Sequence, residues 1–176
     1  KRGGYILYFL TSVTVGEENI DVSAAEKNAE NFLKEHGYGN MVSSYYQKDN
    51  GIATMNFAYS QDGTVCYSDL IKVRVALDSG NIVGIETKGY LMNHKYRDNT
   101  APTLTADEAK EHISTNLEVS STKLAVVPKD SLKEVLCYEF KGVFHDKNFI
   151  VYVNADNGRE EKILLLLEDE NGILTI

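Results

Sequence analysis

The chain has 176 residues, 43% hydrophobic and 25% charged, which is the ordinary composition of a globular protein. Lys and Arg number 18 against 26 Asp and Glu, and the net charge is −8. Binding to a phosphate backbone requires clustered positive charge, so this balance argues against a nucleic-acid partner. The longest purely aliphatic run, Ile163 to Leu167, is far too short to span a bilayer.

Residues 1–13 carry the first structural signal. The run from Gly3 to Leu10 resembles the segments that follow two later turns, Gly80 to Ile85 and Gly158 to Leu164. We therefore expect residues 1–13 to be the trailing strand of a preceding repeat whose front half is missing, and the chain to be a fragment of a longer protein.

A helix followed by a strand meander is predicted for residues 14–91. The helix runs from about Ser23 to His36, begins at a capping box, Ser23-Ala-Ala-Glu26, and ends at Gly37 and Gly39. Turn residues and short links separate the strands, which indicates antiparallel neighbours. The expected strands are Met41–Lys48, Ile52–Tyr59, Thr64–Leu77 and Ile82–Leu91.

The same order returns in residues 104–176. A second capping box, Thr105-Ala-Asp-Glu108, opens a helix predicted from about Ala106 to Leu117. Its apolar side chains are Ala109, Ile113 and Leu117. The expected strands are Lys123–Val127, Lys133–Phe144, Phe149–Ala155 and Glu161–Glu168, with a last turn at Glu170-Asn-Gly172.

The duplication is clearest in one segment of eight residues. Val73-Arg-Val-Ala-Leu-Asp-Ser-Gly80 returns as Val151-Tyr-Val-Asn-Ala-Asp-Asn-Gly158. Alternating valines followed by Asp-x-Gly are typical of a strand that ends in a tight turn. The sequence therefore predicts an α+β fold of tandem repeats, in which one helix packs on an antiparallel β-meander.

Residues 92–103 are predicted to link the two repeats. A simple tether would be polar and rich in Gly and Ser, whereas the repetition breaks here at Tyr90-Leu-Met-Asn-His94. Two interpretations stay open for Tyr90, Leu91, Met92, Asn93 and His94. They pack the junction between the repeats, or part of them forms a partner-binding surface.

Motifs that carry chemistry are absent from the sequence. It has no phosphate-binding glycine loop, nucleophile elbow or His-Glu-x-x-His motif. The histidines (36, 94, 112 and 145) are dispersed and are interpreted as solvated or singly hydrogen-bonded groups, with a metal site assembled only in three dimensions as the alternative. Most carboxylates fall in turns, where they hydrogen-bond to the backbone, and strand packing explains most of the eleven tyrosines. We assign no catalytic, cofactor-binding or metal-binding residue.

Cys66 and Cys137 are too few for a disulfide framework. They lie in different predicted strands, and no neighbouring His or Lys suggests a reactive thiolate. Two buried free thiols are the favoured interpretation, and one disulfide is the alternative.

Several of these segments resemble the C-terminal region of the YpeB-type spore germination proteins, which consists of PepSY-type repeats. The resemblance covers essentially the whole chain and rests on the following runs: Gly4–Leu10, Leu70–Asp78, Gly89–His94, Glu134–Gly142 and Tyr152–Glu161.

The resemblance implies a non-enzymatic protein without a cofactor. Such proteins are anchored outside the inner spore membrane, beside the cortex, by a hydrophobic N-terminal segment that this chain lacks, so we expect the fragment itself to be soluble. They stabilise, localise and restrain a SleB-type cortex-lytic transglycosylase, and they are degraded on germination. SleB is thus the expected partner.

Two competing hypotheses remain from the sequence. The repeats could form an enzyme or a peptidoglycan-binding module that acts on the cortex directly. A cleft with two converging carboxylates or a row of exposed tyrosines would support it. Alternatively, they could form a homodimer of the parent protein through an exposed sheet edge.

Overall fold

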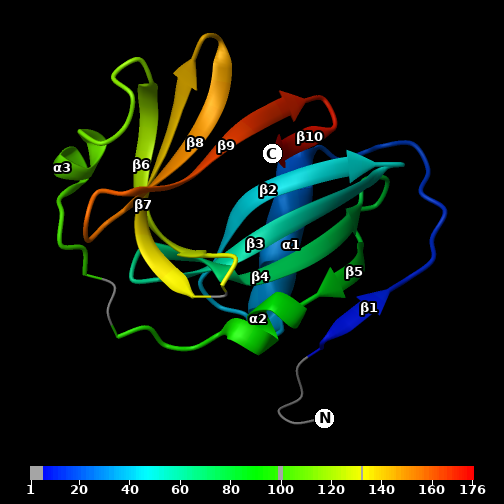
Figure 1. Cartoon of the computed structure of the whole chain (residues 1–176). Coiled ribbons are helices and arrows are strands. Elements are labelled where there is room, and N and C mark those ends of the chain that lie inside the picture. The colour runs from blue at the N-terminus through cyan, green and yellow to red at the C-terminus, as the bar shows by residue number, and fades with distance from the viewer. Residues whose placement is uncertain (1–5, 99–100, 132) are drawn as a thin grey trace. The chain divides into compact units, whose positions relative to one another are not determined.

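The computed structural model describes residues 6–98, 101–131 and 133–176. In these ranges the chain forms ten strands and three helices (Figure 1). In chain order they are β1 (Tyr8–Leu10), α1 (Val22–Glu35), β2 (Met41–Asp49), β3 (Ile52–Gln61), β4 (Thr64–Ala76), β5 (Ile82–Glu86), α2 (Lys88–Asn93), α3 (Ala106–Lys110), β6 (Glu118–Pro128), β7 (Glu134–Phe144), β8 (Lys147–Asn154), β9 (Glu160–Asp169) and β10 (Gly172–Thr175).

Two compact units divide the chain. Unit 1 takes the residues up to Ser60 together with Asp69–His94 and Asp169–Ile173. Unit 2 takes Gln61–Ser68, Lys95–Glu168 and Leu174–Ile176. Each unit is therefore built from three separate stretches of sequence.

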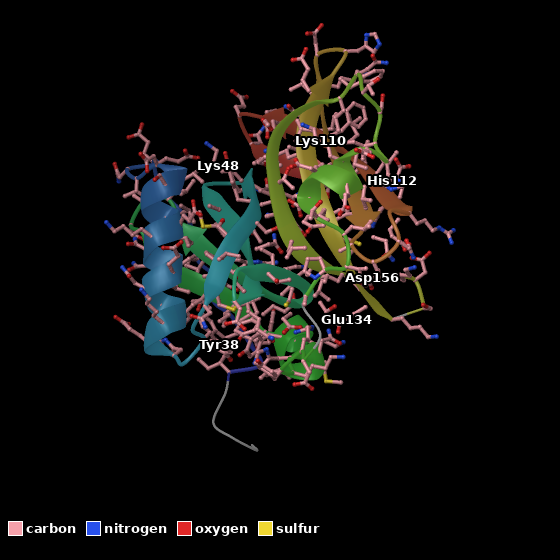
Figure 2. The ribbon with its side chains drawn as sticks, turned by 90° about the vertical axis from the view of Figure 1, so that its left-hand side faces the viewer. Tyr38, Lys48, Lys110, His112, Glu134 and Asp156 are labelled. Carbon is pink, nitrogen blue, oxygen red and sulfur yellow. The ribbon has the colours of Figure 1, made fainter. Side chains whose placement is uncertain are left out.

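In unit 1 the strands follow the order β1-β5-β4-β3-β2, with antiparallel pairing of β1 to β5, β5 to β4 and β2 to β3. Helix α1 lies across one face of these strands (Figures 1 and 2). Its small residues Ala25 and Ala29 and its Leu33 are buried, which lets the helix approach the sheet closely. The strand residues beneath it include Phe57, Ile71, Val73, Val75 and Ile85.

The start of α1 differs from the prediction. The N-cap is Asp21, whose side chain accepts a hydrogen bond from the Ala24 backbone N–H at 2.7 Å. Ser23 lies inside the helix, so the capping box expected at Ser23-Ala-Ala-Glu26 is wrong. A carboxylate two residues upstream supplies the same acceptor to a free helical N–H, and the helix therefore begins earlier.

Unit 2 contains strands in the order β9-β8-β7-β6, and the first residues of β4 pair in parallel with β6. The capping box at Thr105 and Glu108 is confirmed, with both of its hydrogen bonds formed. Helix α3 then ends at Lys110 instead of Leu117. Ser114 accepts a hydrogen bond from the Asn116 N–H, and such local bonding competes with helical pairing.

The two Asp-x-Gly turns are confirmed. Gly80 and Gly158 have φ values of 74° and 73°, and each N–H donates to the carbonyl four residues earlier. A Cβ on Gly158 would lie 2.3 Å from Nε2 of His112, a side chain labelled in Figure 2. Glycine suits these two positions because it adopts a positive φ without strain and because its missing side chain leaves room for the neighbouring residues.

The expected α+β fold of tandem helix-on-meander repeats is wrong. The described part of the chain is mostly β, and its three helices have 14, 6 and 5 residues. The compact units also mix segments that are distant in the sequence. A repeated turn reports a local backbone conformation, and it carries no information on which strands associate over long range.

Two further elements differ from the prediction. The strand expected at Ile82–Leu91 ends at Glu86, and α2 follows. After the predicted last turn the chain forms β10, where Gly172 pairs with Gln47. The repeat boundaries (1–13, 14–91, 92–103 and 104–176) stay a prediction; residues 1–5, 99–100 and 132 within them lie outside the described residues.

Candidate functional site

The segment Tyr90–His94 lies in unit 1. It forms the last four residues of α2 and the C-cap, His94. Its side chains divide into two groups. Tyr90 and His94 pack against other rings, whereas Leu91 and Met92 are 37% and 75% exposed. The helix therefore has an anchored side and an apolar side open to solvent.

Four rings build the anchored side. Tyr90 stacks on His94 with centroids 4.2 Å apart and an interplanar angle of 14°. Tyr59 meets His94 edge-on at 4.5 Å, and Tyr38 meets Tyr90 edge-on at 5.4 Å. Edge-to-face pairs of this kind stabilise beyond the area they bury. We call Tyr38, Tyr59, Tyr90 and His94 the ring cluster.

A buried carboxylate holds the ring cluster in place. Nδ1 of His94 lies 2.9 Å from Oδ2 of Asp69, and the Asp69 side chain is fully buried. Because the carboxylate accepts, Nδ1 carries the proton of this hydrogen bond. Burying a carboxylate is costly unless it is hydrogen-bonded, so the bond from His94 offsets part of that cost, and Asp69 in turn orients the imidazole.

Close backbone packing fixes the start of α2. A Cβ on Gly89 would lie 2.8 Å from the Leu70 carbonyl oxygen on β4. The Asn93 side chain donates to the Gly89 carbonyl at 2.9 Å. These contacts place α2 directly against the strand that carries Asp69.

The pairing of His94 with Asp69 resembles two members of a hydrolytic triad, which would need a nucleophile as its third member. Among the described residues, no serine, threonine or cysteine hydrogen-bonds to the imidazole. The contact between His94 and Asp69 is therefore interpreted as an anchor for α2 and not as part of an acyl-transfer site.

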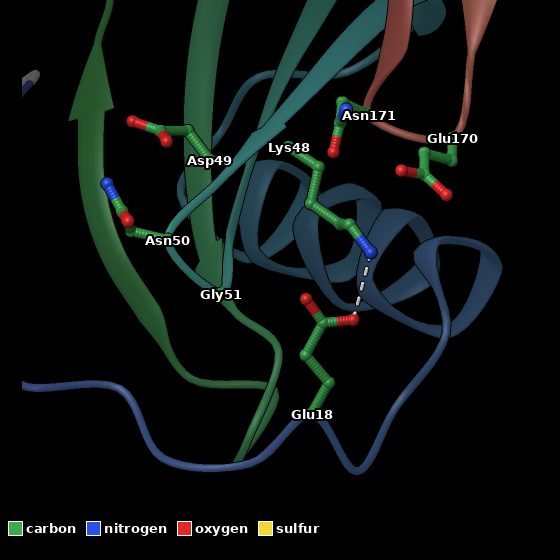
Figure 3. Close-up of a pocket in the computed structure, with 7 residues that line it drawn as sticks. All are labelled: Glu18, Lys48, Asp49, Asn50, Gly51, Glu170 and Asn171. Atoms are coloured by element: carbon green, nitrogen blue, oxygen red, sulfur yellow. Dashed lines mark hydrogen bonds and ion pairs between the residues drawn. The ribbon is translucent and has the colours of Figure 1, made fainter.

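A polar pocket of about 630 Å³ opens elsewhere in unit 1 (Figure 3). Lys48 Nζ pairs with Glu18 Oε2 at 3.0 Å within it. Asn50 and Gly51 at the turn between β2 and β3 have positive φ, which agrees with the predicted turn. The lining is Glu18, Lys48, Asp49, Asn50, Gly51, Glu170 and Asn171. No group of three or more metal-ligating side chains forms here or elsewhere in the described ranges.

Unit 2 contains a buried network around Glu139, which is 5% exposed. The Tyr67 hydroxyl donates to Glu139 Oε2 at 2.6 Å, and Lys123 Nζ lies 3.1 Å from Oε1. Burial, followed by the charge of Glu139, raises the pKa of both Tyr67 and Tyr152. The phenols therefore stay protonated as donors, and the network satisfies a buried charge.

Both cysteines are free and buried, as the favoured interpretation predicted. Cys66 pairs with Val126, while Cys137 pairs with Ala125, so the two lie on opposite sides of β6. Two strand spacings, about 10 Å, exceed the reach of a disulfide. Burial, with the nearby Glu161 charge, raises the pKa of Cys137 to about 12.

We expect both thiols to be inert in the native protein. A thiol reagent such as DTNB at neutral pH should label neither cysteine in the folded chain and both after unfolding, because only the exposed thiolate reacts. Loss of two titratable thiols from the unfolded, unreduced protein would reveal a disulfide and contradict the free-thiol assignment.

Sequence reasoning missed Asp69 and Glu139. Most acids were assigned to turns, yet these two lie inside the strand runs Thr64–Ala76 and Glu134–Phe144. A carboxylate within a predicted strand is the signal that could have identified them. Successive side chains of a strand point to opposite faces, so some of these positions are buried in the core.

None of the described helices is long and apolar enough to cross a membrane. Together, these features define a strand-rich protein in which the ring cluster holds one side of α2 and leaves Leu91 and Met92 exposed on the other. The chain belongs to the YpeB sporulation protein family: the family described as "YpeB sporulation, PepSY1 and PepSY2 domains" matches residues 1–100.

Individual relatives agree with this assignment. A "Sporulation protein YpeB" of Halalkalibacterium halodurans is 41% identical over 97% of this chain and 38% of that protein. The protein of the same name from Bacillus subtilis is 31% identical over 93% of this chain and 37% of its own length. The chain thus spans less than two fifths of these relatives.

A solved structure matches as well. The Bacillus megaterium YpeB C-terminal domain has a TM-score of 0.86 and 30% identity, covering 94% of this chain and 74% of that one. The family resemblance found in the sequence is confirmed.

Proposed function

We propose that this chain is a non-catalytic interaction region that stabilises, localises and restrains a SleB-type cortex-lytic transglycosylase. The observation that carries the proposal is α2, where the ring cluster and Asp69 support two exposed apolar side chains, Leu91 and Met92. Exposed apolar residues on a preorganised base bind with little ordering cost.

The proposed action is steric and thermodynamic. A partner that binds this surface in its folded state is stabilised by mass action, and contact near its active site blocks the substrate. Methionine suits such a surface because its flexible thioether adapts to the facing side chains.

The proposed setting is the outer side of the inner spore membrane, beside the cortex. Membership of a sporulation family supports a place in the spore. The link to the membrane would come from a hydrophobic anchor elsewhere in the parent protein, and the region formed by this chain would act on the cortex-facing side.

Calorimetry with a purified SleB-type enzyme tests the proposal. Met92→Glu and Leu91→Glu should each weaken binding at least about tenfold, since a buried charge disrupts an apolar contact. Val42→Glu is the matched control, because Val42 is also 37% exposed in unit 1 but lies on β2.

Four outcomes are informative. Loss of binding in the α2 variants alone supports the proposal. Absence of any association with the wild-type chain contradicts the partnership. Equal binding by all variants contradicts the assignment of the binding surface to α2. It would favour the alternative interpretation, in which Tyr90–His94 packs within the protein. Direct binding of purified cortex glycan by the wild-type chain, without the enzyme, would favour the peptidoglycan-binding hypothesis.

A further inference from the structure

Unit 2 exposes a continuous aliphatic surface on β9 and β10. Leu165 and Ile176 exchange two backbone hydrogen bonds, of 2.9 and 3.0 Å, so they lie directly opposite each other. Side chains alternate along strands, which places Leu167 beside Leu174 on the same face. We define the β9–β10 face by Ile163, Leu165, Leu167, Leu174 and Ile176.

The exposure of this face is unusual for aliphatic side chains. Ile163, Leu167, Leu174 and Ile176 are 51%, 45%, 44% and 63% exposed. Single exposed apolar residues are common on protein surfaces, but a contiguous group indicates an interaction site.

The face continues into a groove of about 250 Å³. On β8, Val151 pairs with Ile163 and Phe149 pairs with Leu165, so the same apolar layer extends across three strands. The groove is lined by Ser114, Leu117, Phe144, Phe149, Val151, Glu160 and Ile163. Pockets that enclose small ligands are larger, roughly 300–1,000 Å³, so this one suits side chains of a larger partner.

The early end of α3 explains why the surface is open. Residues 111–117 form turns, and from this segment Ile113 and Leu117 reach the sheet. The segment covers β7 and part of β8 but leaves the β9–β10 face uncovered among the described residues. A helix laid over β9 would extend the layer that α3 begins.

The surface is better suited to a short helix than to a second copy of the chain. Four half-exposed aliphatic side chains offer a few hundred Å², whereas a stable dimer buries roughly 800 Å² on each partner. Each copy also carries a net charge of −8, so two copies repel each other. Glu160 at the groove, which makes no ion pair with a described residue, favours a cationic partner.

We propose that the groove and the β9–β10 face bind an amphipathic helix of a partner protein, with leucine-like side chains on one face and lysine or arginine beside it. Helix-in-groove recognition places anchors at i, i+3 or i+4, and i+7. The β9–β10 face spans about 13 Å along β9, which two to three helical turns cover. This surface shares no residue with α2, and the inference does not depend on the proposed role of α2.

The test uses the complete chain and defined peptides of about 14 residues. One peptide contains leucine and lysine with a single apolar face, the second has the same composition in scrambled order, and the third replaces lysine by glutamate. Titration should show saturable binding of the first peptide and at least about fivefold weaker binding of the other two.

Variants locate the surface. Ile163→Asn and Leu174→Asn should each weaken binding of the Leu/Lys peptide at least about fivefold, while Val42→Asn leaves it unchanged. Circular dichroism reports folding, and shifts of the Ile163 and Leu174 methyl NMR signals in the unmodified chain report contact without any substitution.

Several results would overturn the proposal. These are equal binding of the scrambled peptide, unchanged binding by both variants, and peptide-induced shifts confined to other residues. A dimer detected by light scattering that is lost in Leu174→Asn would also overturn it, because the occupant would then be a second copy of the chain.

Discussion

Glu134→Gln should lower the free energy of unfolding by about 2–4 kcal/mol near neutral pH. In unit 2 the guanidinium of Arg97 donates two hydrogen bonds to the carboxylate of Glu134. Nε donates to Oε2 at 3.2 Å, and Nη2 donates to Oε1 at 2.5 Å. The Arg97 and Glu134 side chains are only 6% and 17% exposed. Removing the carboxylate charge takes an anionic hydrogen-bond partner from a nearly buried guanidinium, which is more costly than losing a surface ion pair.

The effect should depend on pH. Burial alone would raise the pKa of Glu134, but hydrogen bonds from Arg97, Ser68 and Lys95 outweigh it and lower the value from 4.5 to about 2. The carboxylate therefore contributes stability above its unfolded value of 4.5, and this contribution disappears as the pH falls toward 2. The difference between the two pKa values corresponds to about 3 kcal/mol, which is the part of the effect that depends on pH.

Urea denaturation at several pH values measures this prediction. The stability gap between wild type and Glu134→Gln should narrow steadily between pH 5 and pH 2. Lys95→Met is the control, since the Lys95 side chain is 63% exposed and should contribute less than about 1 kcal/mol. A gap that stays constant with pH would show that the charge of Glu134 is not what stabilises this site.

His94→Ala should destabilise unit 1 by about 2–3 kcal/mol. The substitution removes the hydrogen bond to fully buried Asp69 and also the stacking partner of Tyr90. Because α2 depends on both contacts, Leu91 and Met92 should lose their fixed positions. Binding of a partner at α2 should weaken as a result.

A double-mutant cycle with Asp69→Asn separates the two contributions. If the hydrogen bond couples the residues, His94→Ala will cost less in the Asp69→Asn background, by about 1 kcal/mol or more. An identical cost in both backgrounds would mean that ring stacking alone anchors His94.

Local chemistry made much of the strand pattern predictable. Thr64 begins β4 as expected, because Asp62 and Gly63 before it specify a turn. Phe144 ends β7 as expected, and a turn at His145 and Asp146 follows it. The Thr105 cap was predictable for a similar reason, as its partner Glu108 lies only three residues away.

Features that depend on distant residues were not predictable. The helical state of Tyr90 requires Gly89 to pack on the Leu70 backbone, and a strand pattern in the sequence does not reveal that contact. Asp69 and His94 are 25 residues apart, so the sequence alone does not indicate that they form a hydrogen bond. The break in repetition singled out this segment, and its division into anchored and exposed sides required the tertiary structure.

The interleaved composition of the two units has a consequence for how the chain responds to a protease. The chain passes from one unit to the other after Ser60, Ser68, His94, Glu168 and Ile173. A single backbone cut therefore cannot separate one complete unit from the other, because each unit combines three stretches of the sequence. Limited proteolysis should accordingly yield no single-cut fragment that corresponds to one whole unit.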